Sequence, residues 1–249
     1  MARKILKILN TLLSISVIVC LLVSGAYAGF ALWDNSQVYS AAENVQEDMI
    51  KLKPKEDAEE GPSFEELLKI NPDVCAWLTL DDTKIDYPVL WSDSSISYIN
   101  TDVYGDFSLS GSIFLDSRNS REFTDSYNLL YGHHMEGGCM FGDLDKFKDA
   151  DKFEKLGSGT LILPDRSYDL EVFAVLLVKA SDKMIFEPDR WSTDISEPLK
   201  FVRENKMYVK ESVLSEVEAA ENPQVLVMTT CSSEFTDART VVMAYMTEK

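Results

Sequence analysis

A long apolar run at the N-terminus constrains this chain more than any other feature of its sequence. Apolar side chains predominate over residues 5–32. The only charged residues before Asp34 are Arg3, Lys4 and Lys7. About 20 apolar residues in a helix cross the hydrocarbon core of a bilayer. Positive charges ahead of such a helix favour a cytoplasmic N-terminus. We therefore predict a single-pass anchor in the cell membrane over residues 1–32, with the rest of the chain outside.

A cleaved secretory signal is the alternative interpretation of this segment. Residues 26–28 read Ala-Tyr-Ala, which resembles the small-x-small pattern of a cleavage site. The apolar run is longer than the usual core of a signal peptide, which favours a retained anchor. Both interpretations place the bulk of the protein outside the cytoplasm.

The charge of the exported part limits its partners. The formal net charge is −18, and because Arg3, Lys4 and Lys7 contribute +3, the remainder carries −21. Binding to nucleic acid requires a basic surface, as does binding to an anionic membrane surface. The charge therefore disfavours both, and we expect no nucleic-acid partner.

Composition divides the exported part in two. Residues 33–62 are polar, and residues 51–60 are almost entirely Lys, Glu, Asp, Pro and Ala. Such a segment is typical of a stalk that is partly helical and partly flexible. Ser63 followed by Glu66 forms a capping-box pattern, which predicts that a folded domain over residues 63–249 opens with a helix.

Short apolar segments bounded by turn-forming residues make up most of this domain, which is typical of β-strands. They cover residues 76–80, 85–90, 111–115, 128–131, 161–163, 168–179, 224–230 and 240–246. Helical patterns cover residues 141–156 and 196–209. About eight strands with helices in their connections predict a mainly β (α+β) domain, built as a barrel or a sandwich.

Three side chains that could perform chemistry lie at the ends of predicted strands. His133 and His134 are the only histidines, and they follow residues 128–131 closely. Cys231 directly follows the strand predicted at 224–230. A thiol nucleophile requires a neighbouring base, which His133 could supply. Arg239 begins the last strand, so an antiparallel hairpin would bring it near the thiol, where a cation stabilises an oxyanion.

Each of these residues also has an ordinary structural interpretation. A histidine after a strand is commonly a surface loop residue. Arg239 could pair with Asp237 or Glu234 at the surface, where an ion pair contributes little. The residues taken one at a time leave both interpretations open.

The cysteine count leaves at least one thiol to explain. Cys20 lies in the apolar segment, and the exported part contains Cys75, Cys139 and Cys231. Three is an odd number, so at least one thiol has no intramolecular partner. The sequence does not decide whether Cys75 and Cys139 form a disulfide. No cysteine or histidine pair has the spacing of a zinc site, and we expect no metal.

Taken together, the motifs resemble the sortase family. They are Tyr-Gly-His at 131–133, Thr-Thr-Cys at 229–231, and Arg239 ahead of a Val-Val strand. Similarity to class B sortases in particular comes from residues 111–116, 130–133 and 140–144 and from the helix predicted at 196–209. The resemblance covers residues 64–249. Two places depart from the family pattern: residues 227–231 match only the end of the usual Thr-Leu-x-Thr-Cys, and His134 replaces a frequent Asn.

The resemblance implies a fold and a reaction. The fold would be a sortase-like eight-stranded β-barrel with helices at its N-terminus and in its connections. Cys231 would attack the Thr carbonyl of a C-terminal sorting signal on exported proteins and form a thioacyl-enzyme. An amine of a peptidoglycan precursor or a pilin would then resolve it. His133 would exchange protons and Arg239 would stabilise the oxyanion, without a cofactor. Substrate contacts are expected from Thr229, Thr230 and Ser232.

Two rival functions remain at this point. A cell-wall cysteine peptidase of the papain-like or NlpC/P60 kind places its cysteine before its histidine, whereas His133 precedes Cys231 here. Catalytic residues do recur in different orders, so the order only disfavours this rival. A non-catalytic surface or adhesion module would suit the anchor and the strands, but it leaves the odd thiol unexplained.

Overall fold

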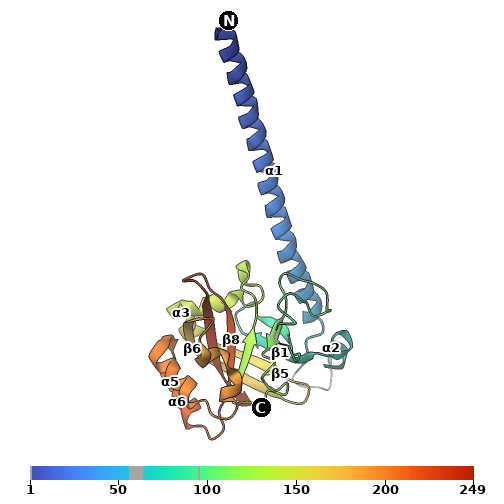
Figure 1. The fold of residues 1–249 in the computed structure, drawn as a ribbon. Helices are drawn as coiled ribbons and strands as arrows, with labels where there is room; N and C mark the ends of the chain where they lie inside the picture. Colours follow the sequence, from blue (N-terminus) through green and yellow to red (C-terminus); the bar gives the residue numbers. More distant parts are fainter. Residues whose placement is uncertain (1, 56–63, 95) are drawn as a thin grey trace. The chain divides into compact units, whose positions relative to one another are not determined.

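A computed structural model describes residues 2–55, 64–94 and 96–249 (Figure 1). The predicted capping residue Ser63 and the proposed boundary between stalk and domain lie outside these residues. The chain divides into two compact units, Met1–Ala41 and Ala42–Lys249. The unit Ala42–Lys249 contains all the residues with candidate chemistry.

Helix α1 (Ala2–Ile50) contains the whole apolar segment. Its most apolar 18-residue window has a mean hydropathy of 2.3, and none of that window is buried. The helix is therefore long and apolar enough to cross a membrane. From Ala42 onward it belongs to the second unit, in which Ala42 and Met49 are buried. The helix thus extends through part of the segment predicted as a stalk.

The second unit is built on a closed barrel. Across the described residues, nine strands form one sheet in the order β5-β1-β2-β3-β4-β8-β9-β6-β7. They are β1 (Val74–Leu80), β2 (Asp86–Leu90), β3 (Ile113–Leu115), β4 (Tyr127–Tyr131), β5 (Ser158–Ile162), β6 (Ser167–Lys179), β7 (Lys206–Val209), β8 (Gln224–Cys231) and β9 (Ala238–Glu248). Since β5 pairs with both β1 and β6, eight of them close the barrel and β7 lies outside it on β6. The predicted eight-stranded barrel is confirmed.

Helices occupy the connections between strands, as expected. Helix α2 (Phe64–Ile70) precedes β1. The β4–β5 connection contains η1 (Glu136–Gly138), η2 (Gly142–Lys148) and α3 (Ala150–Lys155). The β6–β7 connection contains α4 (Lys183–Phe186), η3 (Pro188–Trp191) and α5 (Ser196–Asn205). Helix α6 (Glu211–Ala219) joins β7 to β8.

One predicted element was wrong over part of its length. The helix predicted over residues 196–209 ends at Asn205, and Lys206–Val209 forms β7 instead. Residues 174–176 of β6 pair with Val209, Tyr208 and Lys206 of β7, so this segment is held as a strand. A strand partner distant in sequence overrides the local helical pattern here.

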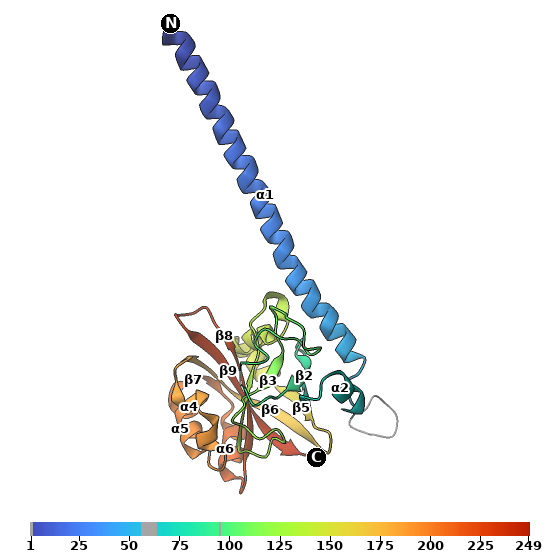
Figure 2. The same ribbon diagram turned by 45° about the vertical axis from the view of Figure 1, so that its right-hand side comes forward.

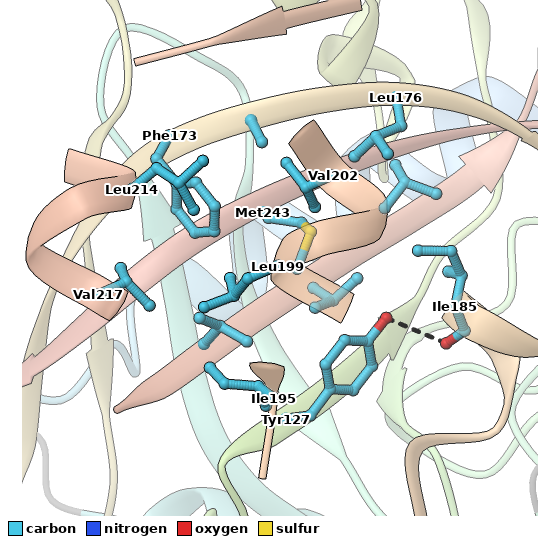
Figure 3. Close-up of a cluster of buried hydrophobic side chains, with 14 of the residues drawn as sticks. Tyr127, Phe173, Leu176, Ile185, Ile195, Leu199, Val202, Leu214, Val217 and Met243 are labelled. Atoms are coloured by element: carbon cyan, nitrogen blue, oxygen red, sulfur yellow. Dashed lines mark hydrogen bonds between the residues drawn. The ribbon is translucent and has the colours of Figure 1, made fainter. Parts of the chain in front are cut away.

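A buried cluster fixes the two strands that carry the cysteine and the arginine. Val227 of β8 and Met243 of β9 belong to it. Figure 3 shows Met243 near side chains of α5 and α6, among them Leu199 and Leu214. Figure 2 shows α4, α5 and α6 gathered on one side of the barrel. In the same cluster the Tyr127 hydroxyl donates to the Ile185 carbonyl at 3.0 Å. Each buried aliphatic side chain contributes about 1.5–3 kcal/mol, so β8 and β9 are held firmly.

A second cluster anchors the long connection between β2 and β3, residues 91–112. It combines Met49 of α1 and Leu67 of α2 with Trp77 of β1. Tyr98 and Val103 are its members from the connection itself. The irregular connection is therefore attached to the barrel through its own buried side chains.

Candidate active site

The β8–β9 hairpin places the predicted nucleophile beside the predicted cation. Cys231 is the last residue of β8 and lies directly opposite Arg239 in the antiparallel register. Directly opposed residues project from the same face, with Cβ atoms about 5 Å apart. The Ser232 N–H donates to the Ala238 carbonyl at 3.0 Å and closes the hairpin. The Cys231 thiol is free and exposed, so a substrate can reach it.

Arg239 does not form the surface ion pair that the sequence left open. Its Nη1 donates to the carbonyl of Ala238 at 2.9 Å. Glu234 pairs instead with Lys148 at 2.6 Å. Among the described residues, neither Glu234 nor Asp237 forms an ion pair with Arg239. The guanidinium can therefore serve a bound substrate.

Strand β4 brings the histidine to the same rim. It runs parallel to β8 with Tyr131 opposite Thr229, and the Gly132 N–H donates to the Thr229 carbonyl at 3.2 Å. A Cβ at Gly132 would lie 2.4 Å from Cδ1 of Ile113 and 2.7 Å from the ring of Phe141, so a side chain there would have to displace both. Since neighbouring strands lie about 4.8 Å apart, His133 emerges next to the end of the cysteine strand.

The predicted catalytic residues line one open pocket of about 410 Å³. Its lining comprises Ile96, Ile99, Phe114, Tyr131, Gly132, His133, Thr229, Thr230, Cys231 and Arg239. Cys231 and Arg239 form one wall with β8 and β9, and Ile96 and Ile99 form another from the 91–112 connection. An apolar groove with a thiol, an imidazole and a guanidinium can bind a peptide and exchange its acyl group.

His134 lies away from this pocket. It forms an isolated β-bridge with Met140, and its Nε2 lies 2.9 Å from Oδ2 of Asp145. His133 is instead in contact with the pocket wall, because its Nε2 lies 2.7 Å from the carbonyl oxygen of Ile99. The geometry favours His133 over its neighbour as the base.

Comparison with known proteins decides the family. The family model described as the sortase domain matches residues 78–247, which is more than half of the chain. The chain belongs to the sortase family. Sortases are cysteine transpeptidases, so the protein is an enzyme of that type.

The relatives narrow the similarity to class B. Sortase B of Listeria monocytogenes is 29% identical over 233 residues, which cover 93% of each chain. A Streptococcus pyogenes class B sortase involved in pilus biogenesis is 33% identical with a TM-score of 0.67, covering 78% of this chain and all of that one. The Staphylococcus aureus sortase B–substrate complex is 26% identical with a TM-score of 0.69, covering 86% of this chain and 98% of that one. The predicted resemblance to class B sortases is confirmed.

Two of the three substrate contacts predicted for this sortase line its pocket. Thr229 and Thr230 are 1% and 2% exposed. Within the described residues, neither hydroxyl has a hydrogen-bond partner. Ser232 is not part of the lining, and its hydroxyl bonds to Glu234 in the β8–β9 loop.

Sequence reasoning missed the support of Tyr131, a pocket residue of this sortase. Its hydroxyl donates to Oδ2 of Asp116 at 2.9 Å, and Arg118 holds that carboxylate at 2.8 and 2.9 Å. Burial acts to raise the pKa of the Asp116 carboxyl, but the Arg118 hydrogen bonds outweigh it and the pKa is lowered. Burial and the Asp116 carboxylate raise the pKa of Tyr131, which stays a neutral donor. The ring of Tyr131 stacks on Phe114 at 5.4 Å and on Phe186 at 6.5 Å.

Sequence reasoning also missed the second wall of the pocket, which Ile96 and Ile99 form. Ile96 is 72% exposed and Ile99 is 36% exposed, although both side chains are apolar. Two isoleucines within a polar stretch were the signal available in the sequence. They lie in an irregular connection, so no strand or helix period pointed to them.

The remaining cysteines of the second unit do not compete with Cys231. Cys75 and Cys139 are buried and free, so they form no disulfide in this structure. Burial raises the pKa of the Cys75 thiol to about 12. Burial, followed by the neighbouring Glu43, also raises the pKa of Cys139. Among the described residues, no group of three His, Cys, Asp or Glu side chains could hold a metal ion.

Proposed function

We propose that this sortase cleaves a C-terminal sorting signal of exported proteins after Thr and transfers the acyl group to an amine. The observation that carries the proposal is the pocket in which an exposed Cys231, His133 and Arg239 meet. The Staphylococcus aureus structure is a complex of a sortase B with a substrate, and it shares this fold. That similarity supports a peptide as the ligand of the groove.

In the first half of the reaction, the Cys231 thiolate attacks the Thr carbonyl carbon and forms a C–S bond. The resulting oxyanion is stabilised by the Arg239 guanidinium, which extends from the same hairpin face. When the peptide C–N bond breaks, His133 gives a proton to the leaving amine. The product is a thioacyl-enzyme on Cys231.

In the second half, an amine attacks the thioester and His133 accepts its proton. The C–S bond breaks and the Cys231 thiolate is regenerated. We propose an amine of a peptidoglycan precursor or of a pilin as the acceptor. The Streptococcus pyogenes relative involved in pilus biogenesis supports keeping the pilin as a candidate.

Thr229, Thr230 and Ser232 are proposed to contact the substrate, with Thr229 as the principal contact. Thr229 is two residues before Cys231, so strand alternation places both side chains on one face. Thr229 also lines the pocket, and its buried hydroxyl has no hydrogen-bond partner among the described residues. Thr230 lines the same wall, and Ser232 lies just beyond it.

We propose that residues 1–32 anchor the enzyme in the membrane, 33–62 form a stalk and 63–249 form the catalytic domain. The N-terminus would be cytoplasmic, because Arg3, Lys4 and Lys7 precede the apolar run. Protease added to intact cells should release the catalytic domain and spare an N-terminal tag. Loss of the tag with retention of the domain would reverse the topology.

The test uses the full chain in detergent micelles with fluorogenic peptides. Their cores are Asn-Pro-x-Thr and Ser-Pro-x-Thr, each followed by Gly, Asn or Ser. We expect cleavage after Thr together with an acyl adduct on Cys231 by intact mass. Cys231→Ala should abolish both, whereas Cys139→Ala, which changes a buried thiol, should retain them. A Cys231→Ala enzyme that still cleaves, or a wild-type enzyme with an inert Cys231 and no cleavage, contradicts the proposal.

A further inference from the structure

We infer that the main-chain carbonyl of Ile99 orients the His133 ring, and that Nδ1 of His133 is the atom that exchanges the proton. The inference rests on the proposed function, since it names the working atom of the proposed base. The Ile99 carbonyl acts only through His133, so Ile99 is a positioning residue. Its side chain also lines the pocket, which makes this connection both a wall and a support.

The tautomer follows from the chemistry of the contact. Nε2 of His133 lies 2.7 Å from the carbonyl oxygen of Ile99. A carbonyl oxygen can only accept, so Nε2 must carry the hydrogen. In the neutral imidazole the other nitrogen, Nδ1, is then the unprotonated one. Proton uptake and release during the acyl transfer therefore pass through Nδ1.

The Ile99 carbonyl lies against Gly111, where the absence of a side chain leaves room for it. This glycine has φ +57°, in the left-handed region that favours glycine. A Cβ there would lie 2.2 Å from the Ile99 oxygen and 2.7 Å from the Tyr98 oxygen. Backbone atoms cannot yield as the end of a flexible side chain can. A larger residue at 111 must therefore change the spacing between residue 111 and the carbonyl that contacts His133.

Further hydrogen bonds hold the chain on both sides of Ile99. The Ser112 N–H donates to the Tyr98 carbonyl at 3.0 Å, and its hydroxyl donates to the Thr101 carbonyl at 2.8 Å. The Tyr98 hydroxyl donates to Asp73 at 2.7 Å. These bonds tie the connection to the chain before β1 and to the start of β3. The position of the Ile99 carbonyl oxygen is thus determined by the fold, independently of any substrate.

The experiment compares Gly111→Ala with Gly105→Ala in the full chain. Gly105 lies in the same connection with φ +87°, but a Cβ there meets nothing within 4 Å. Both variants carry a left-handed alanine, and only one presses on the Ile99 carbonyl. The chain has only two histidines, so an imidazole ¹⁵N spectrum contains two ring systems. A His134→Gln variant assigns them.

Recorded over a pH series, the neutral form of wild-type His133 should have a protonated Nε2 and an unprotonated Nδ1. Gly111→Ala should mix the two tautomers and lower kcat roughly tenfold or more, with KM nearly unchanged, because a small misplacement of a catalytic group is costly. Gly105→Ala should leave the tautomer and kcat as in the wild type. A purely structural effect of Gly111→Ala would alter thermal unfolding and leave the tautomer unchanged.

Two results would overturn the inference. One is a wild-type His133 whose neutral form carries its hydrogen on Nδ1. The other is a folded Gly111→Ala enzyme with the wild-type tautomer and wild-type kcat. If Gly111→Ala does not fold, the wild-type spectrum still decides, and Ser112→Ala supplies a milder displacement. If no peptide is cleaved while the tautomer is as expected, the proposed function fails and the positioning contact stands.

Discussion

The two walls of the active-site pocket are built in different ways. The hairpin wall, β8 and β9, has a continuous antiparallel register from Gln224 to Cys231 and rests on a large apolar cluster. The connection wall, residues 91–112, is irregular along its described residues and is held by particular side chains and Gly111. A ladder of backbone bonds tolerates changes of individual side chains, whereas a wall held by single polar contacts should not. Substitutions on the hairpin wall should therefore affect chemistry. Substitutions on the connection wall should affect stability and, where they displace the Ile99 carbonyl, the chemistry of His133 as well.

The largest effect is expected from the charge on the hairpin wall. Arg239→Lys should lower kcat about 100-fold, because a point charge cannot reproduce the guanidinium fork beside the oxyanion. Arg190→Lys, an exposed arginine paired with Glu187, serves as the control and should be nearly neutral. Steady-state kinetics measure both. Near-normal turnover by Arg239→Lys would reduce Arg239 to a structural role.

The second prediction compares a buried polar group that supports the connection wall with one on the hairpin wall. Asn71 is 7% exposed and donates to the Val103 carbonyl at 3.0 Å and to the Tyr98 hydroxyl at 3.2 Å. Asn71→Ala should lower the free energy of unfolding by about 2 kcal/mol, since it leaves buried groups without partners. Thr240→Val in β9 removes a buried hydroxyl that has no partner among the described residues, so it should be neutral or stabilising. Urea denaturation measures the free energy of unfolding of both variants. If both lost the same amount, the two walls would not differ in how they are held.

A third prediction concerns Tyr131, which lines the pocket between the walls. The pKa of the Asp116 carboxyl is lowered in the folded state. The ionised carboxylate therefore contributes its full share to the free energy of unfolding above the ordinary carboxyl pKa of about 3.9. That contribution is lost as the pH falls below this value. Asp116→Asn should cost about 1 kcal/mol at neutral pH and should flatten the acid dependence below about pH 4. Asp189→Asn, which changes the exposed partner of Arg118, should leave the profile unaltered. If Asp116→Asn lost stability below about pH 4 as steeply as the wild type, Asp116 would not be the source of this pH dependence.

The smallest effect is expected at the loop that joins β8 to β9. Lys148 bonds Glu234 at 2.6 Å and Asp145 at 2.7 Å near the surface. Lys148→Met should cost about 0.5 kcal/mol, because both carboxylate partners are partly exposed and ion pairs near the surface contribute little. The difference from wild type should shrink further in 1 M salt, where the Debye length is about 3 Å. A loss that persists in salt would show that the hairpin wall also depends on single side chains.

The sequence by itself determined the membrane-compatible segment, the strands and the three residues at their ends. Each depends on a pattern within a short window: an uncharged apolar run, alternating strands, or a polar residue where a strand stops. His133, Cys231 and Arg239 could be named because β4 and β8 end, and β9 begins, close to where the local pattern changes.

Only the tertiary structure decided what surrounds these residues. Strand β7, the Asp116–Arg118 support of Tyr131 and the carbonyl of Ile99 facing His133 all depend on partners distant along the chain. The Ile99 contact joins residues 34 positions apart, through a loop whose path is set by Gly111 and Tyr98. Local propensity does not encode such pairs, because their geometry exists only once the barrel has closed and buried the side chains that hold the loop.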